Sequence, residues 1–447
     1  MVDILISGGT VVTLDKERRI IKDGSVAVDG NKITEVGEDQ VLRKKYKADK
    51  VIEAKGRLVL PGFINAHTHC QTSVISLRGH GVETPAGLYQ RTMPIKEFVS
   101  DKERYYIGIA GCLADLRFGV TCIADVDFGE TSIAKVVNDT GMRGTLSEYI
   151  FSLDYQKTKE RGYTFDPEKE KTSLERSLRF IEDWDGKANG RITCTLGPHA
   201  PDACTPELLA KVREEADKRG KKINIHLAQS QEEVDEVKSR YGKTPTEYLR
   251  DNGILGPDCF AAHCVYISEK DIKILSETRT GICHCPLGFA RGGTAAPLVP
   301  WLEAGCIVGL GTDGHPDMIQ KMQVAQIAAS FRMAISGQGY MPKANKVLEL
   351  ATIDAAKVLG LEKEIGSLES GKKADVILVD MRKPHLTPSV DPIADLVYFA
   401  NGNDVETVII DGKVVMENRM IKTVDEQEML RHAQKAGERA WERFHEK

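Results

Sequence analysis

Two histidines separated by a single residue close the segment 61–69, PGFINAHTH, which directly follows the apolar run 58–60. On a β-strand, His67 and His69 would point to the same face, because successive side chains alternate. Two imidazoles aimed the same way from the end of a buried strand can hold one metal ion and leave room for ligands from other strands. The triplet alone also suits surface histidines or satisfied core histidines. A metal site therefore requires further ligands elsewhere in the chain.

Those ligands are available at the ends of other short apolar runs. Together His67, His69, His226 and Asp313 offer three imidazoles and one carboxylate, a set suited to zinc or ferrous iron with space for a water molecule. Water bound to such an ion has its pKa lowered toward neutrality and becomes a usable nucleophile. We expect His263 to orient that water or take its proton, and Asp313 to accept a proton while remaining a ligand. The alternative for His263 is a buried imidazole satisfied by the backbone.

Short apolar strands alternate with longer amphipathic stretches through the middle of the chain, which is typical of βα units and a parallel sheet. Helical patterns separate most of the strands, for example 206–216 with Thr205 as its N-cap and proline at the first helical position. The eight candidate strands span 58–69, 119–127, 143–150, 191–199, 222–228, 258–263, 280–284 and 306–313. They predict an α/β fold with a closed (β/α)8 TIM barrel. An open doubly wound sheet is the alternative, but it would not normally gather polar residues from so many strand ends.

The polar candidates do gather at the C-terminal ends of these strands, the face on which barrel active sites are built. In chain order they are His67, His69, His199, His226, His263, His284 and Asp313. A different pattern occupies both chain ends, where short apolar runs within 3–55 and again within 374–380 and 405–415 are separated by turns. We expect the two ends to complete one small β-sandwich.

The predicted organisation therefore has three parts. Residues 1–56 and 366–423 form the composite β-sandwich, and residues 57–365 form the metal-dependent barrel. Residues 424–447 form a C-terminal helix, whose broad apolar face should pack on the barrel or on a neighbouring subunit.

Composition limits the partners and the compartment. The 447 residues are 41% hydrophobic and include 61 basic and 66 acidic residues, which gives a net charge of −5 without a basic stripe. We expect no nucleic-acid partner and no membrane association. The N-terminus lacks the features of a secretory signal, and the ten cysteines sit in apolar strand-like runs, so we expect a cytoplasmic protein without a disulfide framework. The run 283–285, Cys-His-Cys, lacks a second cysteine pair at zinc-site spacing, which argues against structural zinc.

Several motifs together resemble the amidohydrolase superfamily, in particular its branch of methylthioadenosine/adenosylhomocysteine deaminases and triazine chlorohydrolases (ATZ/TRZ). They are 61–69 (PGFINAHTH), 197–201 (GPHAP), 226–228 (HLA), His263 and 311–313 (GTD). The segment 366–375, GSLESGKKAD, is similar to that family's return into the sandwich, and 78–81, RGHG, to the loop that closes over substrate. The resemblance covers nearly the whole chain.

What the resemblance implies agrees with the analysis of the residues. It implies metal ligation by His67, His69, His226 and Asp313, a water-contacting role for His263, and substrate contact by His199. We also assign His284 to the substrate-binding residues. Some relatives with two metals carry a carbamylated lysine at the end of strand four, where this chain reads LGPH at 196–199. We therefore expect one divalent transition ion, zinc in the first place and iron as the alternative.

One position departs from the family pattern. Three residues after the strand-five histidine, the deaminases and chlorohydrolases of this branch have a glutamate that shuttles protons, whereas this chain has Gln229. An amide can donate or accept a hydrogen bond but cannot exchange a proton near neutral pH. Glu232 and Glu233 follow closely and are candidates to replace the missing carboxylate. The loop after strand eight, 314–318, is also shorter than in the deaminases.

The sequence thus predicts a hydrolase in which metal-activated water attacks a small nitrogen heterocycle or amidine, most simply a deaminase that releases ammonia. His263, Asp313 and Gln229 are the predicted catalytic residues. A triazine-type chlorohydrolase or alkylaminohydrolase is the alternative enzyme. A metal-binding pseudoenzyme that has lost its chemistry with the glutamate is the alternative of another class. The expected partners are a small-molecule substrate and, by resemblance, further copies of the chain in a dimer or tetramer.

Overall fold

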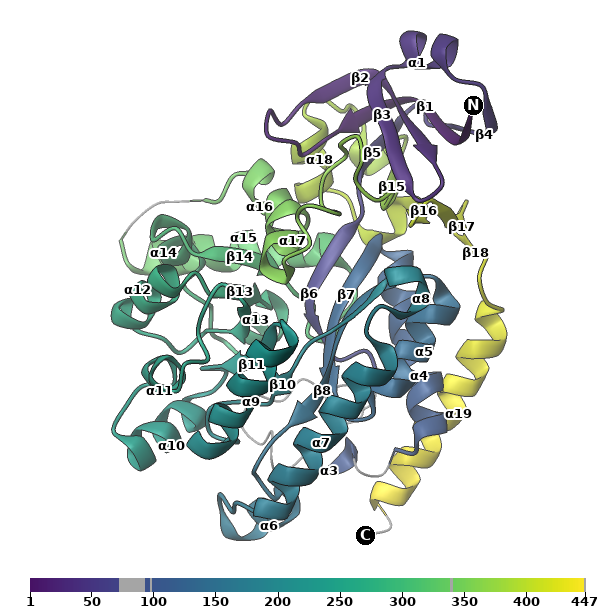
Figure 1. The fold of residues 1–447 in the computed structure, drawn as a ribbon. Coiled ribbons are helices and arrows are strands. Elements are labelled where there is room, and N and C mark those ends of the chain that lie inside the picture. Colours follow the sequence, from purple (N-terminus) through teal and green to yellow (C-terminus); the bar gives the residue numbers. More distant parts are fainter. Residues whose placement is uncertain (72–92, 97–98, 338–340, 446–447) are drawn as a thin grey trace.

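The computed structural model describes residues 1–71, 93–96, 99–337 and 341–445 of an α/β protein (Figure 1). The loop 78–81 lies outside the described residues. Two sheets in the described part are parallel, and a third combines strands from both ends of the chain. Because parallel sheets are covered on both faces, their strands are buried throughout, and every residue of β7 (Val120–Asp127) and β8 (Arg143–Ile150) is buried.

The two parallel sheets contain the strands predicted for the middle of the chain. The five-stranded sheet consists of β6 (Phe63–Thr68), β7, β8, β9 (Ile192–Cys194) and β10 (Gly197–Pro198). The four-stranded sheet consists of β11 (Ile223–Leu227), β12 (Cys259–His263), β13 (Gly281–His284) and β14 (Ile307–Leu310). Hydrogen bonds between Asn224 N–H and Leu196 O (2.9 Å) and between Thr312 N–H and His67 O (3.0 Å) join strands of the two sheets. All their C-terminal ends therefore meet on one side.

Helices follow most of these strands and cover them from outside (Figure 1). The longer ones are α4 (Asp101–Arg117), α5 (Glu130–Thr140), α7 (Pro167–Trp184), α9 (Pro206–Arg219), α10 (Gln231–Tyr241), α12 (Glu269–Thr278) and α15 (Met318–Ile335). The predicted N-cap is confirmed, because the Thr205 hydroxyl accepts a hydrogen bond from Leu208 N–H at 3.2 Å.

Two of the predicted strands are each divided in the structure. The stretch 58–69 forms β5 (Arg57–Pro61) and β6, which belong to different sheets. Between them lies Gly62, where a Cβ atom would stand 2.2 Å from the Thr121 side chain, so only glycine allows the chain to pass. The stretch 191–199 forms β9 and β10, which both pair with β8.

The third sheet has nine strands and brings the chain ends together, as the sequence indicated. Its strands are β1 (Val2–Val12), β2 (Ile20–Asp29), β3 (Lys32–Glu38), β4 (Ala48–Glu53), β5, β15 (Val376–Asp380), β16 (Val405–Ile410), β17 (Lys413–Glu417) and β18 (Met420–Ile421). The two ends meet where β5 pairs antiparallel with β15, with Val59 opposite Leu378. Both side chains are buried in the same apolar cluster.

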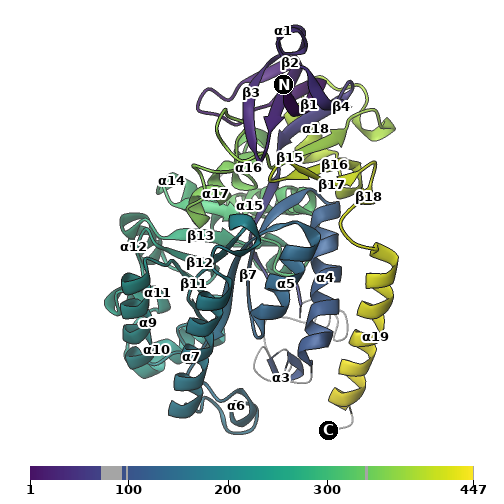
Figure 2. The same ribbon diagram turned by 45° about the vertical axis from the view of Figure 1, so that its right-hand side comes forward.

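The C-terminal stretch forms the helix α19 (Glu426–His445), which runs beside α4 (Figure 2). Ala436 and Ala440 pack with Val99 and Ile107 in one buried cluster. All ten cysteines are buried and unpaired, which confirms that there is no disulfide framework. Among the described helices, none combines the length and apolar character needed to span a bilayer.

A buried ion pair connects the parallel strands to the nine-stranded sheet. The guanidinium of Arg143, at the start of β8, donates hydrogen bonds to both Asp375 oxygens at 2.9 and 3.1 Å and approaches Asp411 at 3.4 Å. Its side chain is only 5% exposed. Removal of one member of such a pair leaves buried charge without compensation.

We predict that Arg143→Met lowers the free energy of unfolding by about 3–5 kcal/mol, because it leaves the buried carboxylate of Asp375 without its cation, whereas Asp411 keeps Lys373 at 3.6 Å. Arg382→Met is the matched control, because Arg382 is 54% exposed in its ion pair with Asp380 and should change stability by about 0–1 kcal/mol. Urea-induced unfolding of both variants measures the difference. Equal losses in the two variants would contradict the role given to Arg143.

Candidate active site

Four imidazoles converge at the C-terminal ends of the parallel strands. The ring centroid of His67 lies 4.8 Å from that of His69, 4.9 Å from that of His226 and 5.0 Å from that of His263. The first two histidines come from β6 and its end, the third from β11 and the fourth from β12. The structure therefore brings together residues that are almost 200 positions apart in the chain, as the strand-end pattern predicted.

Hydrogen bonds from the far side of the rings fix the orientation of two of these histidines. His69 Nδ1 lies 2.6 Å from Val126 O, and His226 Nδ1 lies 2.8 Å from His199 O. Each ring must therefore carry its proton on Nδ1, which leaves Nε2 with a lone pair. The two Nε2 atoms face each other at 3.4 Å.

Asp313 completes the cluster from the end of β14. Its Oδ1 atom lies 3.5 Å from His69 Nε2 and 3.8 Å from His67 Nε2. The side chain of Asn65 positions this segment, because it donates to Thr312 Oγ1 at 2.7 Å and accepts from Thr312 N–H at 2.9 Å. Asp313 itself has φ of 51°, a left-handed conformation that costs free energy and that is found where function holds a residue in place.

Burial keeps the imidazoles neutral. Desolvation lowers the pKa of His67, His69 and His263 well below the usual value, and that of His226 to about 4. Neutral imidazole is the form that binds metal ions. Desolvation also raises the pKa of the Asp313 carboxyl to about 7, while the positive charge of Lys96 acts in the opposite direction.

These side chains fit a divalent cation. Both ring nitrogens of His67 are buried and lack a hydrogen-bond partner within the described residues, which is costly unless something else binds them. Candidate ligand atoms of His67, His69 and His226 lie within 4.8 Å of one another, and Asp313 adds an oxygen donor. A second group, His67, His263 and Cys285, meets the same distance limit. Three imidazoles with a carboxylate are a known donor set for zinc and related ions.

His199 and His284 line the surroundings of the cluster. The His199 ring lies 5.1 Å from the His226 ring, and its Nδ1 atom lies 3.0 Å from the Tyr155 hydroxyl. His284 is buried and packs edge-on against Trp301, with 5.5 Å between the ring centroids. Both residues thus lie where the strand pattern placed them, and their contact with substrate remains a prediction.

Gln229 is half-buried just beyond β11, and its backbone N–H donates to Glu233 Oε2 at 2.9 Å. Ala228 N–H donates to the other oxygen of Glu233 at 2.7 Å. Glu233 is thus a buried carboxyl group that supports the loop carrying Gln229. Desolvation raises its pKa to about 8, and the charge of Asp202 adds to the rise. Glu232 is exposed. Of the two candidates for the missing carboxylate, Glu233 is committed to the backbone and Glu232 faces solvent.

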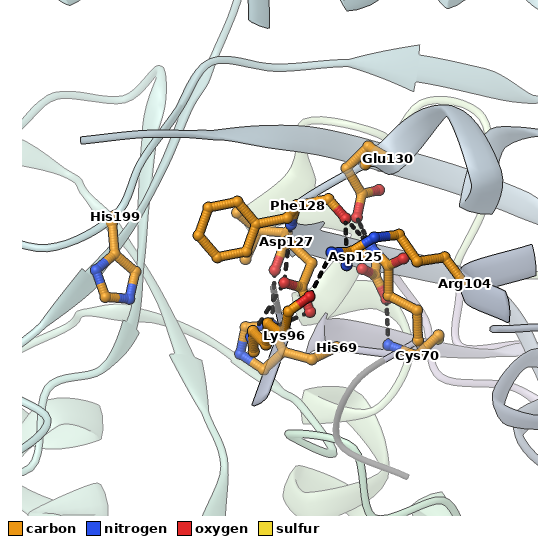
Figure 3. Close-up of polar contacts among 12 residues, drawn as sticks. His69, Cys70, Lys96, Arg104, Asp125, Asp127, Phe128, Glu130 and His199 are labelled. Atoms are coloured by element: carbon orange, nitrogen blue, oxygen red, sulfur yellow. Dashed lines mark hydrogen bonds and ion pairs between the residues drawn. The ribbon is translucent and has the colours of Figure 1, made fainter. Parts of the chain in front are cut away.

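A charged pair that was not predicted from the sequence lies beside the cluster and is formed by Lys96 and Asp127 (Figure 3). Asp127 is the last residue of β7, so the strand-end rule that selected the histidines would also have selected it. Lys96 carries no comparable signal, because it belongs to the short helix α3 (Met93–Lys96) and reaches the site only through the fold.

Comparison with known proteins identifies the family. The Amidohydrolase family model matches residues 58–415. The chain belongs to the amidohydrolase family. It is therefore a hydrolase acting on carbon–nitrogen bonds other than peptide bonds, with a divalent metal as the cofactor and a small molecule as the substrate, which confirms the predicted class.

Among its relatives, the 5'-deoxyadenosine deaminase of Methanosarcina mazei is 38% identical over 98% of both chains. The 5-methylthioadenosine/S-adenosylhomocysteine deaminase of Pelotomaculum thermopropionicum is 37% identical over 97% of this chain and 98% of the relative.

Solved structures share the fold. An adenosine deaminase from Xanthomonas campestris with bound zinc superimposes with a TM-score of 0.88 at 24% identity, over 98% of both chains. The atrazine chlorohydrolase from Arthrobacter aurescens in complex with zinc gives a TM-score of 0.82 at 21% identity, over 97% of this chain and 100% of the other. At this level of identity the likeness concerns the α/β fold and not the substrate.

Proposed function

We propose that this amidohydrolase is a hydrolytic deaminase with one divalent ion, zinc in the first place, held by His67, His69, His226 and Asp313. The observation that carries the proposal is the buried cluster of neutral imidazoles with a carboxylate at 3.5 Å. The zinc ions of the adenosine deaminase and the atrazine chlorohydrolase of the same fold support the choice of metal. A divalent ion at these ligands lowers the pKa of bound water and supplies a nucleophile at neutral pH.

The proposed reaction replaces an exocyclic amino group by oxygen. The water oxygen forms a bond to the ring carbon that carries the amino group, and the bond from that carbon to nitrogen then breaks. One proton of the water completes the ammonia that leaves, the other ends on the ring nitrogen next to the reacting carbon, and the ring keeps a carbonyl oxygen. Deaminases of adenosine derivatives are the relatives at 37–38% identity over nearly the whole chain, so an aminated purine or a related heterocycle is the proposed substrate.

Proton transfer falls to His263 and Asp313 in this proposal. His263 Nδ1 is buried without a partner within the described residues, so the ring can accept and release a proton. The carboxyl group of Asp313 faces His67 and His69 and can take a proton from the nucleophile. Gln229 supplies hydrogen bonds to a ring nitrogen or carbonyl but exchanges no proton. His199 and His284 are the proposed substrate contacts.

The first test measures ammonia release from zinc-loaded protein with a panel of aminated purines, pyrimidines and triazines. We predict turnover of at least one aminated heterocycle, and loss of both zinc and activity in His69→Ala, because that variant removes one ligand and leaves the hydrophobic core intact. His432→Ala is the matched control, because His432 is 45% exposed on α19 and should keep both.

Other products would identify the alternatives. Chloride release from a chlorinated triazine, without ammonia release from any substrate, would favour the chlorohydrolase. Zinc binding without turnover across the panel would favour the metal-binding pseudoenzyme. That alternative is based on position 229, which has an amide and no carboxylate. A zinc content that His69→Ala does not lower would contradict the proposed ligands.

The second test separates Gln229 from the groups that manage the nucleophile. We predict that Gln229→Ala lowers kcat/KM moderately, by about 10-fold, as expected for one lost hydrogen bond. Asp313→Ala and His263→Ala should lower kcat/KM by about 100-fold to 10,000-fold or more, because general acid–base assistance is lost. Steady-state kinetics on the substrate found in the panel measure these ratios. A Gln229→Ala enzyme as inactive as Asp313→Ala would contradict this division of roles.

We also propose that the two parallel sheets close into one (β/α)8 barrel over residues 57–365. The hydrogen bonds that link Leu196 to Asn224 and His67 to Thr312 support closure at both seams. Residues 1–56 and 366–423 would form the β-sandwich, and residues 424–447 the C-terminal helix.

Exposed apolar side chains on α15, among them Phe331 (67%) and Ile335 (88%), support a homo-oligomer. Ten buried unpaired cysteines support a reducing, cytoplasmic location.

A further inference from the structure

The ammonium group of Lys96 is buried at the edge of the histidine cluster. The residue is 4% exposed, and its Nζ atom lies 3.0 and 3.1 Å from the two carboxylate oxygens of Asp127. Arg104 holds the same segment in place, because its guanidinium donates to Lys96 O at 2.5 Å and to Phe128 O at 3.2 Å. Lys96 is therefore fixed between the end of β7 and the helix α4.

Neighbouring residues connect this cation to His69 and to His199. Asp127 follows Val126, whose carbonyl oxygen accepts the His69 Nδ1 proton at 2.6 Å. Lys96 Nζ lies 5.3 Å from the centre of the Tyr149 ring, which in turn lies 4.8 Å from the His199 ring. Figure 3 shows Lys96 next to His69 and below Asp127. The positive charge also lowers the pKa of His69, His199 and Asp313.

A cation at this position is unfavourable in two ways. A buried ammonium loses its hydration, and a single carboxylate compensates it only partly, since Asp127 Oδ1 also accepts a hydrogen bond from Phe128 N–H at 2.8 Å. Moreover, like charges repel, so Lys96 weakens the affinity of the histidine cluster for a metal cation. A contact that only anchored α3 would not require a positive charge next to a cation site.

We propose that Lys96 is a specificity-determining residue that binds a carboxylate of the substrate, so that the enzyme acts on an amino-substituted nitrogen heterocycle bearing an acidic group. This inference rests on the proposed deaminase function and specifies its substrate class. An ammonium group has three N–H donors, and Asp127 accepts two of them. Within the described residues the third N–H has no acceptor, so an anionic group of the substrate can accept it, and a charge-assisted hydrogen bond of this kind is among the stronger ones in proteins.

Gln229 is consistent with the same substrate class. A glutamate three residues after His226 would add a negative charge to the pocket and repel a substrate carboxylate. The amide of Gln229 adds none. An amide at position 229 and a buried lysine at position 96 both leave the site less negative than carboxylates would, which favours an acidic substrate over a neutral nucleoside.

The test compares matched pairs of ligands that differ only in an acidic group. Suitable probes are adenosine with adenosine-5'-carboxylate, and 4-aminopyrimidine with 4-aminopyrimidine-5-carboxylate. Calorimetry on the zinc-loaded protein measures their Kd values independently of turnover. We expect the acidic member of at least one pair to bind about 10- to 100-fold more tightly, as for one charge-assisted hydrogen bond.

Three variants isolate the charge of residue 96 while avoiding an unpaired buried carboxylate. Asp127→Asn keeps the lysine and should keep the preference for the acidic ligand. The double variant Lys96→Met with Asp127→Asn replaces the ion pair by neutral side chains and should lose the preference, with zinc content unchanged. Lys96→Arg as a single substitution keeps a positive charge at this position and should keep part of the preference for the acidic ligand.

The outcomes separate this proposal from the proposed function. Equal binding of neutral and acidic members in every pair, or an unchanged preference in the double variant, would overturn the role of Lys96 even if ammonia is released. Tighter binding of an acidic ligand that depends on Lys96 would support the role even if no probe is deaminated. In that case the deaminase proposal would fail on its own assay.

Discussion

The arrangement of the site depends on how the cost of burying polar groups is offset at the point where the parallel strands end. Isolated imidazoles in an apolar interior lose hydration, and that cost must be offset by hydrogen bonds or by a bound ion. Here the backbone satisfies the Nδ1 atoms of His69 and His226. Their Nε2 atoms face each other, and those of His67 and His69 lie within 3.8 Å of Asp313 Oδ1. The strands, the Asn65–Thr312 hydrogen bonds and the left-handed backbone at Asp313 all maintain that arrangement.

Two residues set the charge around this cluster. The proposed metal ligands lie in the motifs that resemble those of amidohydrolases, whereas Gln229 stands where the resemblance implies a carboxylate and Lys96 brings a cation close to the cluster. The amide of Gln229 cannot shuttle protons, and the ammonium group of Lys96 can hold an anion. Relatives that are 37–38% identical and act on adenosine derivatives therefore indicate the reaction more firmly than they indicate the substrate.

Much of the parallel part of the fold could be predicted from sequence, because buried parallel strands are continuous apolar runs bounded by polar residues. The strand expected at 143–150 has the same bounds as β8. The divided strands were not predictable, because the break at Gly62 depends on the close approach of Thr121, a contact made across the sheet.

The residues of the candidate site were likewise only partly predictable from the sequence. Histidines at strand ends were visible in the sequence because their spacing follows the strands. Asp127 obeys the same rule and was overlooked, while Lys96 was not predictable, because its role depends on a carboxylate 31 positions away along the chain. The support that Glu233 gives to the Gln229 loop likewise becomes apparent only from two backbone hydrogen bonds.

X-ray absorption at the zinc edge tests the central claim most directly, on protein loaded with one equivalent of zinc. The account predicts a first shell of nitrogen and oxygen atoms at about 2.0–2.2 Å, contributed by three imidazoles, Asp313 and water. Cys285 lies within reach of His67 and His263, so a competing position for the ion exists in the same pocket. A sulfur neighbour at about 2.3 Å would place the ion at that position and contradict the account.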